Sequence, residues 1–487
     1  MLLDPIQCRK AILARDARFD GRFFTGVLTT GIYCRPVCPA RPPKAENCRY
    51  YPSAAAAQAA GFRPCLRCRP ETAPGLGAWR GASNTVSRAM ALIEAGALDD
   101  GDVEALADRL GVGERHLRRL FLKHIGASPV SVAQTRRVHI AKQLIHETNL
   151  PMTEIALASG FGSIRRFNET MLALFKRPPT ELRRIAGTAA GAHAGITLSL
   201  GYRPPLDWDA ILGFLALRAI PGVEAVESGV WRRTIAFDGS VGEIEVAHEP
   251  DRNRLRATIR FPALAALPRI IARIRQVFDL DADPEAINAA LARDPRLAPL
   301  VSARPGLRVP GAWDGFELAV RAILGQQITV TAATRLAGQI AHTWGQAYEG
   351  VGLTRIFPTS ESLANAVISG MPGARASSIA RLAAAISENP RLIERADNLE
   401  ASIDRLCALP GIGEWTANYI AMRALREADA FPAADIGLLR ALEAGGERPR
   451  PAELLALSQS WRPWRAYAAM HLWTAPIRKE KSHELAA

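Results

Sequence analysis

Four cysteines near the start of the chain stand in two close pairs. Three residues separate Cys34 from Cys38, two separate Cys65 from Cys68, and 26 lie between the pairs. Four thiolates at this spacing suit tetrahedral Zn²⁺, and a small module with a modest apolar core gains folding stability from such a site. A set of unrelated free thiols is the alternative, which a double close pair disfavours. The sequence therefore predicts one zinc ion bound by all four cysteines.

A second group of residues suited to chemistry lies near the other end of the chain. Gly411 and Gly413, in the stretch Leu-Pro-Gly-Ile-Gly, stand between two helical patterns. They would let backbone amides approach a phosphate at a helix N-terminus, although an ordinary turn between helices is the alternative. Asp435 follows Gly413 by 22 residues and begins a new helix after Pro432, where a role as helix N-cap would suffice to explain it.

Hydrophobic periodicity indicates the elements that must position these groups. Residues 86–184 have helical spacing, and 196–264 contain alternating patches typical of strands, at 234–237, 243–246 and 255–261. Helical patterns return from 284 to 478. The expected fold is multidomain and mainly α, with a small α+β zinc domain and an α+β subdomain built on an antiparallel sheet. Composition shifts at 70–83, at 187–195 and near 281–284 predict four domains, at residues 1–78, 84–186, 194–283 and 284–480.

Composition and charge narrow the function classes. A chain of 487 residues that is 48% hydrophobic and 22% charged is neither disordered nor fibrous. Residues 1–185 carry 28 basic and 16 acidic side chains, a net charge of +12. The rest of the chain therefore carries only +1 of the total net charge of +13. A polyanionic partner is therefore expected, held mainly by the N-terminal part. No apolar run has the length of a signal peptide or membrane span, which predicts a cytoplasmic, nucleoid-associated protein without a membrane partner.

Two segments, 103–125 and 152–175, each contain a helix, a glycine-containing turn and a second helix. This is the spacing of a helix-turn-helix motif, although a structural bundle with solvated arginines is the alternative. The second helices present basic residues at their exposed starts, and we expect base contacts from Arg118 and Arg165 and phosphate contacts from Arg119 and Arg166. The full set of candidate DNA-binding arginines is Arg115, Arg118, Arg119, Arg165 and Arg166.

The tandem arrangement, joined by a long helix through 136–145, resembles the AraC-type transcription-factor domain. The Ile-Ala-x3-Gly-Phe-x-Ser core of that family stands at 155–163. The glycine that usually precedes its late proline is absent, because Lys176 and Arg177 precede Pro178. The resemblance implies binding to double-stranded DNA, with RNA polymerase as the partner of an activator.

The stretch from FTGVLTTGIYCRPVC to GFRPCLRCRP resembles the N-terminal domain of the Ada adaptive-response family over nearly its whole length. The resemblance implies that Cys34 is both a zinc ligand and the acceptor of a methyl group from a DNA methylphosphotriester. Zinc keeps the sulfur as a nucleophilic thiolate. Methylation changes the charge of zinc with four thiolates from about −2 to about −1, which predicts tighter DNA binding. A second methyltransferase domain with a Pro-Cys-His-Arg motif, usual in Ada, is missing, so repair of O6-methylguanine is not expected.

The stretch LPGIGEWTANYIAMRALREADAFPAADIGLLR resembles the helix-hairpin-helix DNA glycosylases of the AlkA type, and the likeness extends over about 196–478. It implies a helix-hairpin-helix glycosylase domain in which Asp435 stabilises an oxocarbenium-like state as an alkylated purine such as 3-methyladenine leaves. It also implies a base pocket of Trp415, Tyr419 and Trp473, for which core packing is the alternative.

Three departures define the expected subclass. Trp415 stands where strand-cutting members carry a Schiff-base lysine, so a monofunctional hydrolase is predicted. Beyond the N-terminal module only Cys407 is available, so no iron–sulfur cluster is expected, while Cys8 and Cys48 are expected to be free thiols. Gln327 replaces the leucine that wedges into DNA, where it could still fill the gap left by a flipped base.

These features favour a fused alkylation-response protein that contains a zinc methyl-acceptor, an activator domain and a glycosylase acting on alkylated DNA. Two alternatives remain. The first is a transcriptional regulator whose glycosylase-like half binds DNA without catalysis. The second is a glycosylase whose basic N-terminal part is only an anchor.

Overall fold

The computed structural model describes residues 3–75, 84–99, 101–186, 195–350, 352–443 and 447–475. The domain limits expected at 78, 194 and 480 lie outside these residues, as does most of the segment expected to link the N-terminal and C-terminal halves. The remaining elements follow the predicted order of a mixed N-terminal module, a helical module, a sheet and a second helical region.

The N-terminal module is a small four-stranded sheet with strand order β3-β1-β2-β4. β1 pairs antiparallel with β2 and β3, and β2 pairs parallel with β4. Because β2 ends at Cys34 and β4 immediately precedes Cys65, this parallel pair brings the two cysteine loops to one end of the sheet. The elements are α1 (Pro5–Ala14), β1 (Phe24–Val27), β2 (Ile32–Cys34), β3 (Cys48–Tyr51), α2 (Ala54–Ala59) and β4 (Arg63–Pro64).

The second module is entirely helical over its described residues, as predicted. Its elements are α3 (Asn84–Glu94), α4 (Val103–Arg109), α5 (Glu114–Ile125), α6 (Pro129–Glu147), α7 (Met152–Ala158), α8 (Ile164–Phe175) and α9 (Pro179–Ala186). The pairs α4–α5 and α7–α8 are the two helix-turn-helix motifs, and α6 joins them. Gly126 ends α5 with φ +76°, and Lys176 takes the corresponding left-handed position after α8 with φ +56°. A lysine therefore makes the turn for which glycine is usual.

A five-stranded antiparallel sheet with order β5-β9-β8-β7-β6 starts the second half. The strands predicted at 234–237, 243–246 and 255–261 overlap β7, β8 and β9. The elements are β5 (Ile196–Gly201), α10 (Trp208–Ala216), β6 (Glu224–Glu227), β7 (Val230–Phe237), β8 (Ser240–Glu249), β9 (Arg254–Arg260) and α11 (Leu267–Val277).

Helices make up the rest of the chain and enclose its largest hydrophobic core. They are α12 (Pro284–Leu291), α13 (Ala298–Ala303), α14 (Gly315–Leu324), α15 (Val330–Trp344), α16 (Ser360–Ala364), α17 (Gly373–Glu388), α18 (Leu399–Cys407), α19 (Glu414–Arg423), α20 (Ile436–Ala441), α21 (Pro451–Leu457) and α22 (Arg465–Trp473).

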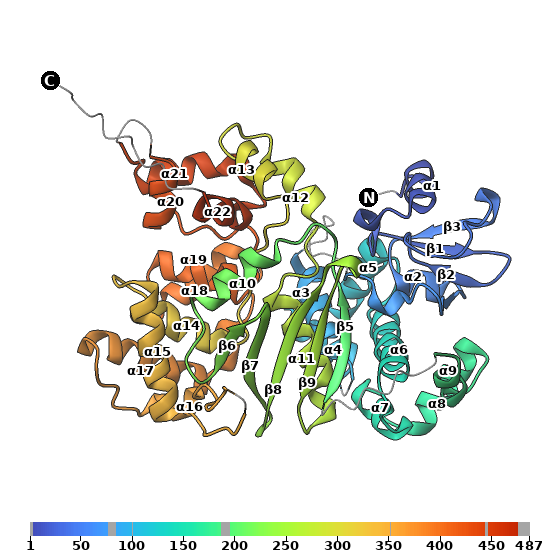
Figure 1. Ribbon diagram of the computed structural model, residues 1–487, viewed down its shortest axis with the longest axis horizontal. Helices are drawn as coiled ribbons and strands as arrows, with labels where there is room; N and C mark the ends of the chain where they lie inside the picture. The colour runs from blue at the N-terminus through green and yellow to red at the C-terminus, as the bar shows by residue number, and fades with distance from the viewer. Residues whose placement is uncertain are drawn as a thin grey trace.

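The two halves of the chain share a hydrophobic core. Buried side chains of α6, α7 and α8, including Leu144 and Phe167, belong to the same cluster as Leu198 of β5 and Trp231 of β7. The sheet accordingly lies between the N-terminal half and the C-terminal helices (Figure 1). The edge strand β5 also meets α6 through a hydrogen bond from Gln143 Nε2 to the Ser199 carbonyl (2.9 Å).

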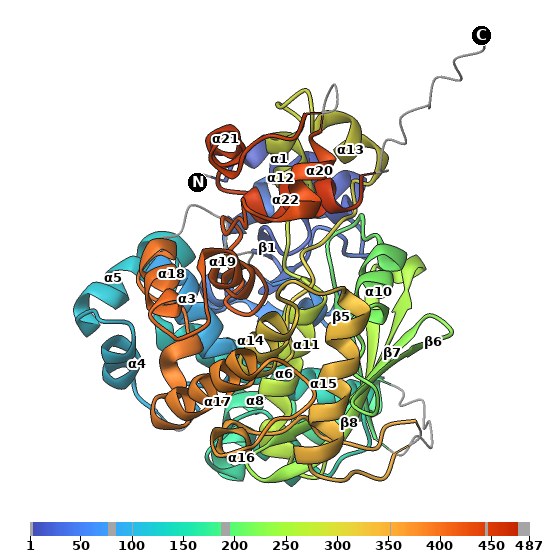
Figure 2. The same cartoon turned by 90° about the vertical axis from the view of Figure 1, so that its left-hand side faces the viewer.

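A second contact joins the first helix-turn-helix module to the C-terminal helices. Arg88 of α3 pairs with Asp397, and Arg109 of α4 pairs with Glu394, in the segment that leads into α18. Figure 2 shows α3 and α18 side by side in this region.

The zinc module also contacts the second half. Arg22 pairs with Asp283, and Arg203 donates to the carbonyls of Asp20 and Gly75. The four predicted domains therefore pack against one another.

Candidate functional sites

The four predicted metal ligands come together at one end of the small sheet. The Sγ atoms of Cys34, Cys38, Cys65 and Cys68 all lie within 4.8 Å of one another. Backbone N–H groups of Arg35 and Arg67 donate to Cys68 Sγ and Cys65 Sγ, both at 3.4 Å, as expected around thiolates. Ligand type, number and spacing therefore fit one tetrahedral Zn²⁺. Cys8 and Cys48 are free and lie outside this group.

A buried ion pair supports the cysteine loop from the helical module. Lys142 Nζ of α6 donates to the Cys65 carbonyl (2.9 Å) and to Glu71 (2.6 Å), and neither of the two charged side chains is exposed to solvent. Burial by itself raises the pKa of Glu71, but the charges of Lys142 and Arg69 bring it down to about 2. The zinc site is thereby fixed to the helix that joins the two helix-turn-helix motifs.

The five candidate DNA-binding arginines are all exposed, at the start of α5 and α8. Arg118 pairs with Glu114 and Arg165 with Glu169, each one helical turn away, and Arg119 donates to His116. Exposed pairs of this kind contribute only a few tenths of a kcal/mol, so DNA can displace them at little cost. The predicted base-contacting and phosphate-contacting roles stay predictions.

The Gly411–Gly413 hairpin joins α18 to α19, as predicted. Gly411 has φ +84°, and a Cβ there would lie 2.2 Å from Ser378 Oγ, so only glycine fits. Gly413 is the N-cap of α19, offers no capping side chain, and a Cβ there would meet nothing within 4 Å. Gln326 Nε2 fixes the hairpin by donating to the Gly411 carbonyl (2.9 Å) and Thr416 Oγ1 (3.1 Å). Exposed N–H groups at this helix start can bind a phosphate.

Asp435 is both the N-cap of α20 and the centre of a hydrogen-bond cluster. Its Oδ1 accepts from the Gly437 and Leu438 amides (2.8 and 3.1 Å) and from Trp473 Nε1 (2.8 Å), while its Oδ2 accepts from Trp415 Nε1 (3.0 Å). The first two bonds are the predicted cap. The two indole donors, which come from α19 and α22, go beyond a cap and hold the half-buried carboxylate in one orientation.

The aromatic residues next to Asp435 form a stacked wall. The rings of Trp415 and Tyr419 are nearly parallel, with centroids 5.4 Å apart. Arg423 donates to Tyr419 Oη (2.9 Å), and its guanidinium also lies over Phe214 of α10. Burial raises the pKa of Tyr419, but Arg423 and Arg218 outweigh this effect and lower it to about 8. Two of the three predicted aromatic residues thus donate hydrogen bonds to the Asp435 carboxylate, and the third, Tyr419, stacks on Trp415.

Gln327 lies in the loop between α14 and α15, next to the hairpin-bound Gln326. Its side chain is exposed and its φ is +60°, which is uncommon for a residue with a side chain. Arg375 holds this loop by donating to the Gln326 carbonyl (2.6 Å). The loop therefore presents Gln327 outward from a fixed base beside the hairpin.

Two supporting residues were missed from the sequence. A Cβ at Gly437 would lie 3.0 Å from Asp435 Oδ1 and 3.2 Å from the Trp473 ring, so one of these two side chains would have to shift by a few tenths of an ångström to admit it. The position of Gly437 two residues after an N-cap aspartate was the available signal. Lys142 gave no local signal, because its partners Glu71 and Cys65 are distant in sequence.

Among the described helices, none is long and apolar enough to cross a membrane.

Comparisons with known proteins match most of the chain. Models of the metal binding domain of Ada, a helix-turn-helix domain and the AlkA N-terminal domain match residues 7–71, 106–185 and 197–314, respectively. The probable bifunctional transcriptional activator/DNA repair enzyme AlkA of Mycobacterium tuberculosis is 42% identical over 477 residues, which is 96% of each chain. The chain belongs to this AlkA family of fused proteins.

Two further relatives cover a little more than half of this AlkA family member. DNA-3-methyladenine glycosylase 2 of Escherichia coli is 34% identical over 56% of this chain and 96% of its own length. The solved structure of a 3-methyladenine DNA-glycosylase from Archaeoglobus fulgidus superposes with a TM-score of 0.51 at 25% identity, over the same shares of the two chains. The helix-hairpin-helix glycosylase fold predicted for this half is confirmed, as is the mainly α multidomain architecture.

Proposed function

We propose that the second half of the chain is a monofunctional DNA glycosylase that excises alkylated purines such as 3-methyladenine. The observation that carries this proposal is the Asp435 carboxylate, held by two indole N–H groups beside a phosphate-binding hairpin. The family membership and the 3-methyladenine glycosylases among the relatives support it.

In the proposed reaction, the bond between deoxyribose C1′ and the base nitrogen breaks, and its electron pair leaves with the base. Positive charge then develops on the sugar, and Asp435 stabilises it while a water molecule adds at C1′ and releases one proton to solvent. Oδ1 already accepts three hydrogen bonds, whereas Oδ2 accepts one from the described residues. Oδ2 is therefore the oxygen that we assign to the sugar.

The same geometry suits the flipped base. An alkylated purine is cationic, a good leaving group and attracted to electron-rich rings, which Trp415, Tyr419 and Trp473 provide. Gln327 enters the gap that the base leaves in the duplex. The Gly411–Gly413 hairpin binds the DNA backbone.

The test measures free base released from methylated duplex DNA. Wild type should release 3-methyladenine, and Asp435→Asn should release none while still binding abasic DNA. Release by Asp435→Asn at the wild-type rate would contradict the mechanism. Binding by wild type without any release would favour a regulator with a non-catalytic glycosylase fold.

We propose that the first half accepts a methyl group on Cys34 and responds by binding DNA more tightly. The Cys34 sulfur attacks the methyl carbon of a methylphosphotriester, an S–C bond forms, the C–O bond breaks, and the phosphodiester leaves with the electron pair. Bound zinc supplies the thiolate form of the sulfur. The arginines of α5 and α8 then bind DNA at the nucleoid, and the protein activates transcription through RNA polymerase.

Mass spectrometry of the protein after incubation with methylated DNA tests this half. One methyl group should appear on Cys34, and DNA affinity should rise. Cys407→Ala, at an exposed thiol outside the cysteine cluster, is the matched control and should behave as wild type. Cys34→Ala should gain no methyl group and show no rise in DNA affinity. If the wild-type protein releases base normally but gains no methyl group, the first half is only a basic anchor for the glycosylase.

A further inference from the structure

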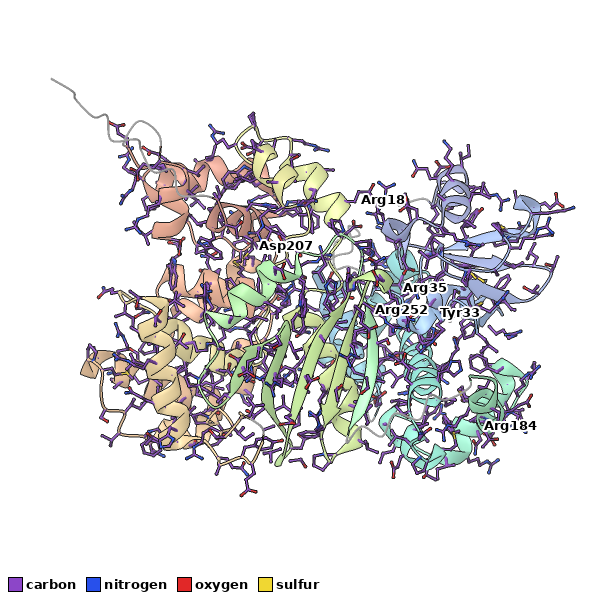
Figure 3. All side chains as sticks on the ribbon, in the orientation of Figure 1. Arg18, Tyr33, Arg35, Arg184, Asp207 and Arg252 are labelled. Carbon is purple, nitrogen blue, oxygen red and sulfur yellow. The ribbon has the colours of Figure 1, made fainter. Side chains whose placement is uncertain are left out.

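A cleft of about 260 Å³ lies where the zinc module meets the glycosylase half. One wall comes from the cysteine loops and includes Arg35, Arg67 and Cys68. The other comes from the end of β5 and from the turn between β8 and β9, which carries Arg252. Arg35 and Arg252 are on opposite sides of this junction between the small N-terminal sheet and the central sheet (Figure 3). The cleft therefore exists only because the two halves are fused.

The charge of the cleft is dominated by arginines. Three are neutralised by carboxylates, since Arg35 pairs with Asp20, Arg69 with Glu71 and Glu147, and Arg254 with Glu249. Arg67 and Arg252, one from each wall, are exposed and pair with no carboxylate in the part of the chain described. Asp251, on the same turn as Arg252, is the remaining acidic residue of the walls. Two guanidinium groups thus face solvent beside the cysteine cluster.

The metal ligand Cys68 lines this cleft directly. Four thiolates and Zn²⁺ carry a charge of about −2, which opposes a nearby phosphate, and methylation of one sulfur halves that charge. The arginines of the cleft therefore attract an anion more strongly once Cys34 has been methylated. A phosphate is the anion that fits, because guanidinium groups bind phosphate oxygens in a fork.

We infer that this cleft binds a backbone phosphate of the DNA from which the methyl group is taken, with Arg252 of the glycosylase half as one of its ligands. The inference rests on the proposed methyl transfer to Cys34. It makes the glycosylase half part of the methylation-dependent DNA switch, through a side chain distant from Asp435 and from the hairpin.

The experiment uses the full chain with Arg252→Ala and follows binding to a fluorescent, unmodified DNA duplex at several salt concentrations, before and after methylation. Loss of one phosphate contact should lower the slope of log affinity against log salt by about 0.9 and weaken binding by methylated protein about tenfold at 0.1 M salt. The unmethylated protein should lose less. Arg252→Lys keeps the charge but not the fork, so it should keep the wild-type salt slope and lose part of the affinity.

Arg269→Ala is the matched control, since Arg269 is also a surface arginine of this half but pairs with Asp238 outside the cleft. Suppose that mass spectrometry finds one methyl group on Cys34, and that Arg252→Ala has the same salt slope and DNA affinity as Arg269→Ala. That result would overturn the inference about the cleft and leave the proposed methyl transfer intact. Absence of the methyl group from wild type would overturn the proposed transfer and the inference together.

Discussion

Trp473 Nε1 donates a hydrogen bond to Asp435 Oδ1 at 2.8 Å, across 38 residues of sequence. Trp473→Phe keeps an aromatic ring but removes this donor. Hydrogen bonds to charged groups are each worth about 1.5–3 kcal/mol, so base release should slow by about 10- to 100-fold if the bond acts in the transition state. Single-turnover release from methylated DNA measures this. A rate equal to wild type would mean that the indole does not position the carboxylate.

The two hairpin glycines should respond differently to alanine. Gly411→Ala places a Cβ at positive φ and 2.2 Å from Ser378 Oγ, so it should destabilise the protein by more than about 1 kcal/mol. Gly413→Ala has space for its methyl group and should fold normally, but the methyl should hinder phosphate at the α19 amides. Thermal unfolding and DNA affinity, measured together, separate the two effects. Unchanged DNA binding by Gly413→Ala would remove that residue from the interface.

Lys176 occupies a left-handed position with φ +56° at the end of α8. Lys176→Gly should relieve this conformation and raise the free energy of unfolding by about 1 kcal/mol, as measured by urea denaturation. Gly126→Ala, at the matching turn after α5, should lower it, because the new Cβ also lies 3.1 Å from Pro52 Cγ. If Lys176→Gly lowers the free energy of unfolding instead, the lysine side chain stabilises the fold by more than its left-handed backbone destabilises it.

The fully buried pair of Lys142 and Glu71 should be sensitive to loss of one partner. Lys142→Met leaves the Glu71 carboxylate without its closest cation and should destabilise by about 3–5 kcal/mol. The double variant Lys142→Met/Glu71→Gln should recover part of this loss. Calorimetry of the zinc-loaded full chain is the measurement, and equal stabilities of the single variant and wild type would contradict the assigned pair.

Tyr419, with its pKa lowered to about 8, should give pH-dependent behaviour. Because the folded-state pKa lies below the usual value near 10, the phenolate is favoured in the folded state. Its contribution to stability is present in full above pH 10 and is lost as the pH falls through 8. A tyrosinate absorbance step near pH 8 should be present in wild type and absent from Tyr419→Phe. Persistence of that step in Tyr419→Phe would assign it to another tyrosine.

Much of each local site could be predicted from the sequence, because close spacing limits where side chains can lie. Each close cysteine pair places its two thiols together, and Asp435, three residues after Pro432, was predicted to cap a helix and does so. The meeting of the two cysteine pairs needs the parallel pairing of β2 with β4. Trp415 and Tyr419 had to share a helix face because they are four residues apart. Such local relationships depend on backbone periodicity, which tertiary packing leaves unchanged.

The relationships between distant segments were decided only by the tertiary structure. The indole of Trp473 reaches Asp435 because α22 packs beside α20, and Lys142 reaches the Cys65 loop because α6 packs against the zinc module. The composition shifts predicted four domains and carried no information on their contacts. Apolar faces of α6–α8 and of the sheet bury each other in one core. Burial of apolar surface has no preferred sequence separation, so spacing predicted the local arrangement of each site, while packing determined which distant side chains complete it and which sites are joined.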